Sequence, residues 1–173
     1  GNDLVRALLE SGKDLEATPY GTEALGVMRI EKGHPAGNEL NGQTTAFNLG
    51  LENMVKKDKR KIGTVLAQRS GLTQLDGERL MGFVPSDKSQ VLRAGAHLFD
   101  KNVAVTVQND QGWLSSATFS PSLGHHIGLG FISDGKAKIG QKVVAIDSLR
   151  KKNIQVEIVS PQFIDPKGIR LRA

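Results

Sequence analysis

The chain has 173 residues, of which 38% are hydrophobic and 24% are charged. A compact chain of this length buries roughly 70% of its unfolded surface, so it can form one domain or two small ones. It contains no cysteine, which excludes a disulfide scaffold, a thiolate metal site and a cysteine nucleophile, and which fits a reducing, cytoplasmic setting. No apolar run reaches the roughly 18 residues of a membrane-spanning helix, so we expect no membrane partner.

The chain is basic, with 23 Lys and Arg against 18 Asp and Glu, a net charge of +5 and a pI near 9.6. Such an excess favours either a solvated surface or an anionic partner, such as nucleic acid or a ligand that carries carboxylates. Single-stranded nucleic acid is bound largely by stacking on aromatic side chains, which make up 5% of this chain. We therefore expect no nucleic-acid partner.

Two helices are predicted in the N-terminal part. The first is capped by Asn2 or Asp3 and ends at 11–12. A turn at 19–21 precedes the second, which begins at Thr22 and ends before 34–38. The predicted inward residues are Leu4, Val5, Leu8 and Leu9 in the first helix, and Leu25, Val27 and Met28 in the second.

After these helices, apolar residues alternate over 47–51 like a half-buried strand, and a short helix is expected at 63–68. From about residue 75 the hydrophobic period becomes two, with turn residues between short runs. This spacing predicts a compact antiparallel barrel or sandwich, with a domain boundary near 70–76. The predicted strands are 79–84, 96–99, 103–107, 113–119, 127–132, 142–146 and 154–159.

Two conspicuous motifs are interpreted as structural. His125 and His126 are adjacent, so on a strand they point to opposite faces and cannot chelate one ion together. No metal site is expected. The glycine-rich run 124–130 lacks the strand-loop-helix setting of a dinucleotide site, so we interpret it as barrel architecture.

Arg29 and Glu31 are the charged pair that draws attention near the end of the second helix. Residues two apart do not share a helix face, so the two are expected to have separate partners. A carboxylate can accept a bidentate pair of N–H donors from a heterocycle, whereas the alternative is an exposed charge at a helix end.

The motifs taken together resemble a known family. Residues 18–63, TPYGTEALGVMRIEKGHPAGNELNGQTTAFNLGLENMVKKDKRKIG, are similar to the folate-binding core of the aminomethyltransferase (glycine-cleavage T-protein) superfamily. The segments GERLMGFV, LRAGAHLFD and GWLSSATFSPSLGHHIGLGFI resemble its C-terminal barrel, with its S-x-x-x-S-P-x-L signature. Within the superfamily, the residues of these motifs are most similar to the C-terminal region of sarcosine oxidase alpha subunits.

The resemblance implies an α+β fold in two parts. Residues 1–72 correspond to the C-terminal part of an incomplete α/β folate-binding domain, and residues 73–173 to a small antiparallel β-barrel domain. The opening Gly-Asn-Asp, without Met, agrees with the expectation that the chain is the last part of a longer subunit. The N-terminal half of the family, with its carboxylate near the reactive folate nitrogen, has no counterpart here, so no catalytic residue is expected in this chain.

Site residues are also implied by the resemblance. Glu31 falls on the family glutamate that holds the pterin ring, and Arg29 on the preceding arginine, as a structural or a ligand-contacting residue. Lys56 or Lys57 lies near the basic position that meets the glutamate carboxylates of folate, and Tyr20 is a stacking candidate. Two departures weaken the expected site: Ala46 stands where the family has proline, and the run 59–63 replaces D-F-I-G.

The resulting hypothesis is the folate-binding portion of sarcosine oxidase, an enzyme that oxidises sarcosine to glycine with release of hydrogen peroxide. Tetrahydrofolate is the cofactor expected in this region, whereas FAD or FMN and NAD are implied only for the whole enzyme. The expected partners are the beta, gamma and delta subunits. Two alternatives stay open: the aminomethyltransferase of glycine cleavage, and a non-catalytic assembly module.

Overall fold

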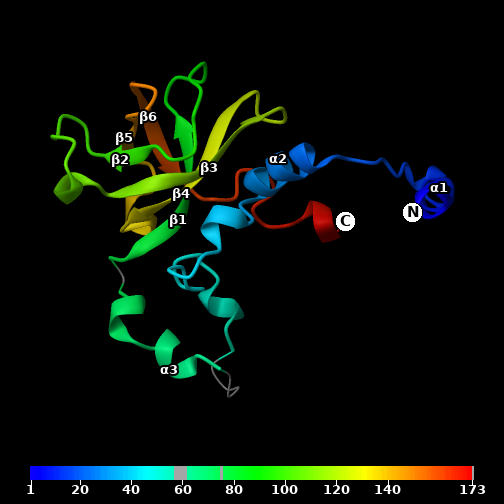
Figure 1. Cartoon of the computed structure of the whole chain (residues 1–173), viewed down its shortest axis with the longest axis horizontal. Coiled ribbons are helices and arrows are strands. Elements are labelled where there is room, and N and C mark those ends of the chain that lie inside the picture. The colour runs from blue at the N-terminus through cyan, green and yellow to red at the C-terminus, as the bar shows by residue number, and fades with distance from the viewer. Residues whose placement is uncertain (57–61, 75, 173) are drawn as a thin grey trace.

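The computed structural model describes residues 1–56, 62–74 and 76–172. A closed antiparallel β-barrel, with strand order β1-β4-β3-β2-β5-β6, forms its centre, and the segments before and after the barrel lie outside it (Figure 1). The predicted α+β class and antiparallel barrel are confirmed. The strands are β1 (Glu78–Pro85), β2 (His97–Phe99), β3 (Gly112–Ser120), β4 (His125–Ser133), β5 (Lys142–Asp147) and β6 (Lys152–Val159).

The barrel closes because β1 pairs with β4 along one edge and with β6 along the other. Alternate residues of each strand point inward, so a single apolar cluster fills the interior. Leu92 and Ala96, from the connection between β1 and β2, join this cluster. Its other buried members are Met81, Phe83, Leu98, Leu114, Ile132, Val143, Ala145, Ile154, Val156 and Ile158.

Six predicted strand runs appear as strands whose ends differ from the expectation by one or two residues. The predicted strand at 103–107 is wrong, because this stretch is an exposed loop that leads into a 3-10 turn at Val107–Asn109. Its alternating valines imitate a strand, but the neighbouring β2 already pairs with β3 on one side and β5 on the other. No edge of the closed barrel is left for it to join.

The glycines of β4 fit the predicted architectural role. A Cβ atom on Gly130 would overlap the carbonyl oxygen of Trp113 and lie 3.0 Å from the Cα atom of Leu114. Strand β3 therefore approaches β4 more closely here than a side chain allows.

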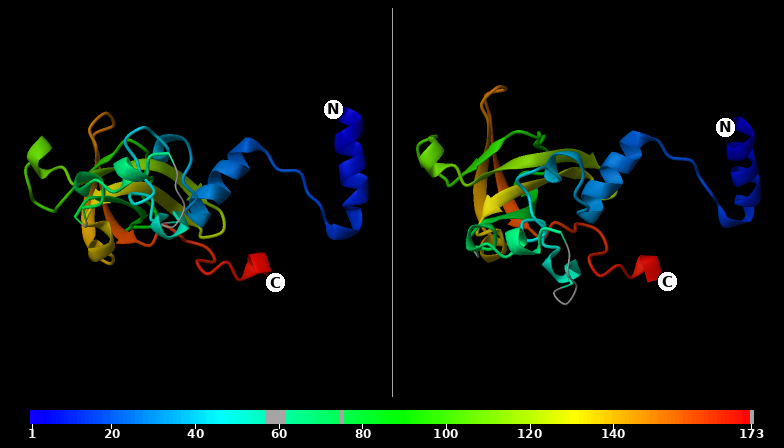
Figure 2. Two further views of the ribbon diagram at one scale, coloured as in Figure 1. Left: turned by 90° about the horizontal axis from the view of Figure 1, so that it is seen from below. Right: turned by 60° about the horizontal axis from the view of Figure 1, so that its bottom comes forward.

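In the part of the chain that the structure describes, three α-helices precede the barrel: α1 (Asn2–Ser11), α2 (Thr22–Lys32) and α3 (Thr64–Ala67). All three fall where the sequence predicts helices. The predicted cap of the first helix by Asn2 or Asp3 is wrong, because Gly1 is the N-cap residue and both side chains lie within the helix without a capping hydrogen bond. Helix α1 stands away from the barrel in every view (Figures 1 and 2). Its residues are all exposed, including the apolar face that was expected to point inward. Further single 3-10 turns lie at Lys13–Leu15, Gly37–Glu39, Glu52–Met54, Ser70–Leu72, Gly135–Lys138 and Arg170–Arg172.

Helix α2 packs its C-terminal end on the outside of the barrel, against β3 and β4. Ile30 is buried there in a second apolar cluster with Leu129 and Phe131. The expectation that Leu25 and Met28 point inward is wrong, since both are exposed. The helix touches the barrel at its last turns only, so the residues of its first turns have no barrel surface beneath them.

The predicted strand at 47–51 is also wrong, because this segment forms successive turns. The Asn48 side chain accepts hydrogen bonds from the backbone N–H and the hydroxyl of Thr45, and Gly50 has φ +72°. Such local bonds favour turns over strands. The Arg79 guanidinium of β1 then stacks 3.3 Å over the Phe47 ring and fixes the turns against the barrel.

Candidate functional site

The candidate site lies where the end of α2 meets the end of β3. Glu31, in the last turn of α2, is 7% exposed, and its Oε1 atom accepts a hydrogen bond of 2.5 Å from the Ser120 hydroxyl. In the described part of the chain, no hydrogen bond reaches its second oxygen, Oε2. The carboxylate is thus fixed through one oxygen and keeps acceptor capacity on the other.

A carboxylate at this position is locally unfavourable. The C-terminus of a helix carries partial negative charge, so an acidic side chain in the last turn is repelled rather than stabilised. Lys32 and the Ser120 hydroxyl offset part of this cost. Departures from local preference of this kind occur mainly where function demands them.

Arg29 belongs to a neighbouring cluster that joins α2 to the barrel. Its guanidinium donates to Oε2 of Glu39 at 2.9 Å and to the Ser116 hydroxyl at 2.7 Å. Glu39 is completely buried, and its Oε1 atom accepts hydrogen bonds from the hydroxyls of Ser115 and Ser116, at 2.5 and 2.6 Å. The separate partners predicted for Arg29 and Glu31 are confirmed.

Electrostatics keep Glu39 ionised despite its burial. Desolvation raises the pKa of this carboxyl, but the hydrogen bonds from Ser115, Ser116 and the Ala36 N–H, together with the Arg29 charge, outweigh it and leave the pKa below 4.5. The pair is therefore a charged clamp between α2 and β3.

The C-terminal segment holds the other side of the same helix end. The backbone N–H groups of Phe163 and Ile164 each donate to the Glu31 carbonyl oxygen at 3.0 Å. The ammonium group of Lys32 donates to the carbonyl oxygen of Asp165 at 2.5 Å. Between them, β3 and this segment determine where the Glu31 side chain points.

The remaining predicted site residues are placed apart from Glu31. Tyr20 is 65% exposed and precedes α2, whereas Glu31 lies at its far end, about 15 Å away along the axis at 1.5 Å per residue. Lys56 is exposed just after the 3-10 turn at Glu52–Met54. Lys57, the alternative to Lys56, lies outside the described residues.

The segment that leads to Lys56 is attached at the opposite end of the barrel wall from Glu31. Glu52, four residues earlier, contacts Arg79, which pairs in register with Ile132 of β4. Ser120, the partner of Glu31, pairs with His125 at the other end of β4. Seven residues of strand separate the two points, or about 23 Å at 3.3 Å per residue.

The sequence did not reveal the partners of Arg29 and Glu31. Ser116 and Ser120 are the two serines of the S-x-x-x-S-P signature, and Glu39 is the acidic residue of GNELNG. Both motifs were visible, but only the fold shows that they meet. The hydroxyls at 116 and 120 lie on one strand, four residues apart, and so reach two different carboxylates of the α2 region.

The histidine pair gives no ion site in the described part of the chain, where no three metal-ligating side chains come together. His125 bonds through Nδ1 to the His126 carbonyl oxygen at 2.8 Å, and His126 packs edge-on against Phe119. Within the described residues, the buried Nδ1 atom of His126 has no hydrogen-bond partner.

Protonation of His126 is expected to destabilise the fold. Burial lowers the pKa of His126 below its usual 6.5, and the nearby Arg93 and His125 charges lower it further. The unfolded chain then binds this proton more readily, so the stability contribution is present above pH 6.5 and is lost as the pH falls below it. Urea unfolding between about pH 7.5 and 5.5 should show this slope, and His126→Gln should flatten it.

The same substitution at the exposed His34 is the control, and the slope should persist there. Retention of the full slope in His126→Gln would show that another group carries it.

The comparison with known proteins agrees with this geometry. The sequence profile described as the glycine cleavage T-protein C-terminal barrel domain matches residues 78–165. The chain belongs to the glycine cleavage T-protein family. The profile described as the GCVT N-terminal domain matches residues 1–59, which contain α1, α2 and Glu31. The family resemblance predicted from the motifs is confirmed.

Individual members of the family extend the comparison. The sarcosine oxidase subunit alpha of Rhizobium meliloti is 39% identical over 172 residues, which are 99% of this chain and 17% of that protein. An aminomethyltransferase of Thermoanaerobacter pseudethanolicus is 28% identical over 165 residues, which are 93% of this chain and 42% of that protein. The predicted similarity to sarcosine oxidase alpha subunits is confirmed.

The fold of the family is also found in a solved structure. The crystal structure of the glycine cleavage system aminomethyltransferase T from Bartonella henselae matches with a TM-score of 0.72 and 25% identity. It covers 95% of this chain, which spans 45% of that structure. The chain thus spans less than half the length of each of these relatives. None of the described helices is long and apolar enough to cross a membrane.

Proposed function

We propose that this chain is the folate-binding end of a sarcosine oxidase alpha subunit. The observation that carries the proposal is the Glu31 carboxylate, nearly buried, held by Ser120 through one oxygen and with its second oxygen available. The 39% identity to the Rhizobium meliloti subunit supports this assignment over other members of the family.

The carboxylate suits the pterin ring of tetrahydrofolate. That ring presents adjacent amino and ring N–H groups, which a carboxylate accepts as a bidentate pair. Oε1 still has a free lone pair after its bond to Ser120, and Oε2 has both. Arg29, committed to Glu39 and Ser116, serves in this proposal as a positioning residue for the helix end.

The basic segment suits the other end of the ligand. Lys56 or Lys57 would meet the glutamate carboxylates of folate, and Tyr20 would stack near the site. Ser120, which holds Glu31, and Arg79, which contacts Glu52, pair with opposite ends of β4. A ligand that extends from Glu31 to the basic segment after Glu52 must therefore be long, as a molecule with a heterocycle at one end and carboxylates at the other is.

Tetrahydrofolate, when bound, accepts the one-carbon unit that is released from the N-methyl group of sarcosine. The residues of this chain act by orientation: Glu31 holds the ring, Ser120 holds the Glu31 carboxylate and the clamp holds the end of α2, so proximity accounts for their contribution to the rate. With dioxygen as the oxidant, the overall products are glycine, hydrogen peroxide and methylenetetrahydrofolate, or, when water takes the place of folate, formaldehyde. We assign no catalytic residue to this chain.

In this proposal, the other components of the enzyme would lie outside this chain. The flavin, FAD or FMN, and the NAD site would lie upstream or on the beta, gamma and delta subunits, in the cytoplasm. Residues 1–72 would be the last part of the folate-binding domain and residues 73–173 the barrel domain. The matches at 1–59 and 78–165 support this division.

The aminomethyltransferase of glycine cleavage is the second candidate, because the Bartonella henselae structure has the same fold. Sarcosine-dependent formation of hydrogen peroxide by the full-length protein would support the oxidase. Folate-dependent release of ammonia from an aminomethylated carrier protein would support the transferase.

The folate site is tested by replacing Glu31 with glutamine in the full-length subunit. Glutamine keeps the size of the side chain and an acceptor for Ser120 but loses the charge and one acceptor. Calorimetric titration should show tetrahydrofolate binding weakened about 30-fold, the effect of losing a charged hydrogen-bonded pair. Glu23→Gln, at the exposed start of the same helix, should bind as the unmodified protein does.

Unchanged affinity in Glu31→Gln would overturn the site assignment. Loss of binding in both variants would show that the charge of α2, rather than the Glu31 position, is responsible.

A further inference from the structure

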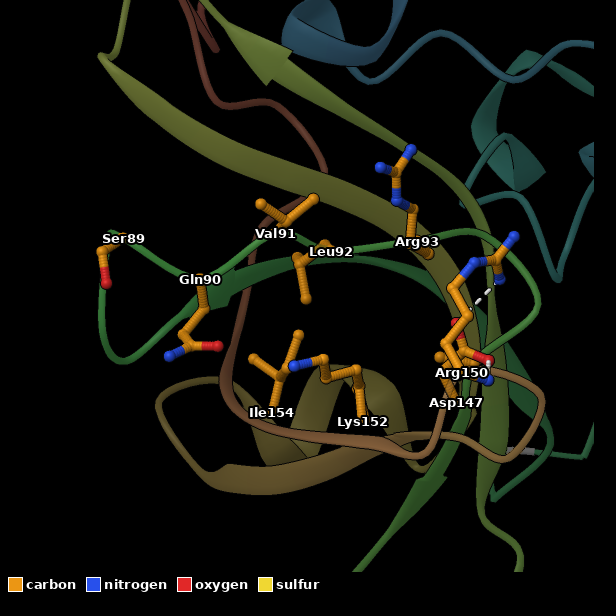
Figure 3. A pocket seen from close by; sticks show the side chains of 11 residues that line it. Ser89, Gln90, Val91, Leu92, Arg93, Asp147, Arg150, Lys152 and Ile154 are labelled. Carbon is orange, nitrogen blue, oxygen red and sulfur yellow. Dashed lines mark hydrogen bonds and ion pairs between the residues drawn. The ribbon is translucent and has the colours of Figure 1, made fainter.

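A second site lies at one end of the barrel, between the β1–β2 connection and the β5–β6 hairpin (Figure 3). Residues 89–93 form one wall, and Asp147, Arg150 and Lys152 form the other. The pocket has a volume of about 320 Å³. None of Tyr20, Arg29, Glu31 and Lys56 lines it, so it is independent of the proposed folate site.

The floor of the pocket is apolar. Leu92, Ala96, Ala145 and Ile154 line it, and all four belong to the barrel core. Side chains of the core are here accessible from outside through a polar rim, the usual construction of a small-molecule site. An occupant must therefore carry an apolar body.

The rim carries uncompensated positive charge. Asp147 is neutralised by Arg150, whose guanidinium lies 2.8 Å from its Oδ2 atom and whose N–H donates to its Oδ1 atom at 3.0 Å. These bonds hold the pKa of Asp147 below its usual range. Arg93 and Lys152 remain, and neither has an ion-pair partner in the described part of the chain.

The side chain of Lys152 is oriented so that its positive charge lies near the apolar floor of the pocket. Figure 3 shows its side chain extended toward the side of the pocket where Ile154 lies, with Leu92 on the facing wall, while Arg93 points away from the floor at the rim. An anionic group bound by Lys152 would thus sit directly beside the apolar surface. A cationic ligand would meet repulsion from both free cations.

We propose that this pocket binds a small organic carboxylate whose apolar body rests on Leu92, Ala145 and Ile154 and whose carboxylate pairs with Lys152. A volume of about 320 Å³ lies at the lower end of the range of small-molecule sites, so a ligand with a single ring is of suitable size. Benzoate has this size and chemistry and is the probe. Benzamide, its neutral counterpart of the same shape, is the matched control.

The proposal is tested by NMR titration of the 173-residue chain with benzoate and with benzamide. Benzoate should shift the backbone amides of 89–93, Ala145 and Ile154, and benzamide should bind about tenfold more weakly, as expected for loss of a charged hydrogen bond. Lys152→Gln should weaken benzoate binding by the same factor and leave benzamide unchanged. Lys142→Gln removes the same charge from β5 outside the pocket and should have no effect.

Three results would overturn the proposal: equal affinities for benzoate and benzamide, unchanged benzoate binding in Lys152→Gln, or shifts scattered over surface lysines. Titration with inorganic phosphate tests whether the pocket binds any anion or requires an apolar body as well. Phosphate binding as tight as that of benzoate would show that the apolar floor contributes nothing, and would also overturn it. The folate titration above reports on Glu31 alone, so the two proposals fail separately.

Discussion

Replacing Glu39 by alanine should lower the free energy of unfolding by about 3 to 5 kcal/mol, the cost of removing one partner of a buried ion pair. The substitution removes the carboxylate that pairs with the Arg29 guanidinium and that accepts a hydrogen bond from the Ser115 hydroxyl. Urea unfolding, followed by the fluorescence of the single tryptophan, Trp113, measures the loss. Trp113 lies on the strand that carries these serines, so its signal reports on the clamp.

The matched control is Glu23→Ala, which removes the same group from the exposed first turn of α2, the helix that carries Arg29. Only the interaction with the helix dipole is lost there, so the expected cost is below about 1 kcal/mol. A double-mutant cycle with Arg29→Met should then show a coupling energy of about 1 kcal/mol or more between positions 29 and 39. Equal losses of stability in Glu39→Ala and Glu23→Ala, or no coupling between positions 29 and 39, would show that the Arg29–Glu39 pair does not hold α2 to the barrel.

Gly130→Ala should destabilise the barrel by about 3 kcal/mol, at the upper end of the range for overpacking. A methyl group at this position overlaps the Trp113 carbonyl oxygen and lies 3.1 Å from the Phe83 ring, so β3 must move away from β4. The displaced strand carries Ser116 and Ser120, and therefore also the anchors of Arg29 and Glu31. Chemical unfolding measures the stability, and the folate titration of the full-length protein measures the effect on the site.

Gly26→Ala is the control for this substitution. Gly26 lies within α2, and a Cβ atom there meets nothing within 4 Å. Alanine at such a helical position is expected to stabilise by about 0.5 to 1 kcal/mol. Opposite signs for the two glycines would confirm that close strand approach, rather than backbone entropy, determines the role of Gly130. Stabilisation by both would show that the barrel accommodates the methyl group.

Periodicity predicted the barrel strands because each has one face in the core and one outside, which produces an alternating pattern. The same rule failed at 47–51 and 103–107, where alternation is present but no strand partner exists. In the first case side-chain bonds from Asn48 favour turns, and in the second the closed barrel has no open edge. Strand formation depends on a neighbour that lies far away in the sequence.

The helices likewise combine a property that the local sequence determines, their position, with one that distant contacts determine, their orientation. Their positions follow from local turn and glycine residues such as Gly33, which ends α2 in a left-handed conformation, and these act within a few residues of the chain. Their orientations do not, because Leu25 and Met28 have the apolar character of buried residues and yet lie off the barrel. Which face of α2 is covered depends on where β3 and β4 pass beneath it.

The sequence by itself determined the family, the barrel class, and Glu31 as the candidate carboxylate, because these follow from local motifs and from hydrophobic period. Only the tertiary structure decided what holds Glu31. Ser116 and Ser120 come to α2 from 87 and 89 positions along the chain, and the C-terminal segment arrives from still further. Contacts of that separation are determined by the closure of the barrel and its strand register. The apolar floor and free lysine of the second pocket likewise meet only because the barrel brings 89–93 beside the β5–β6 hairpin.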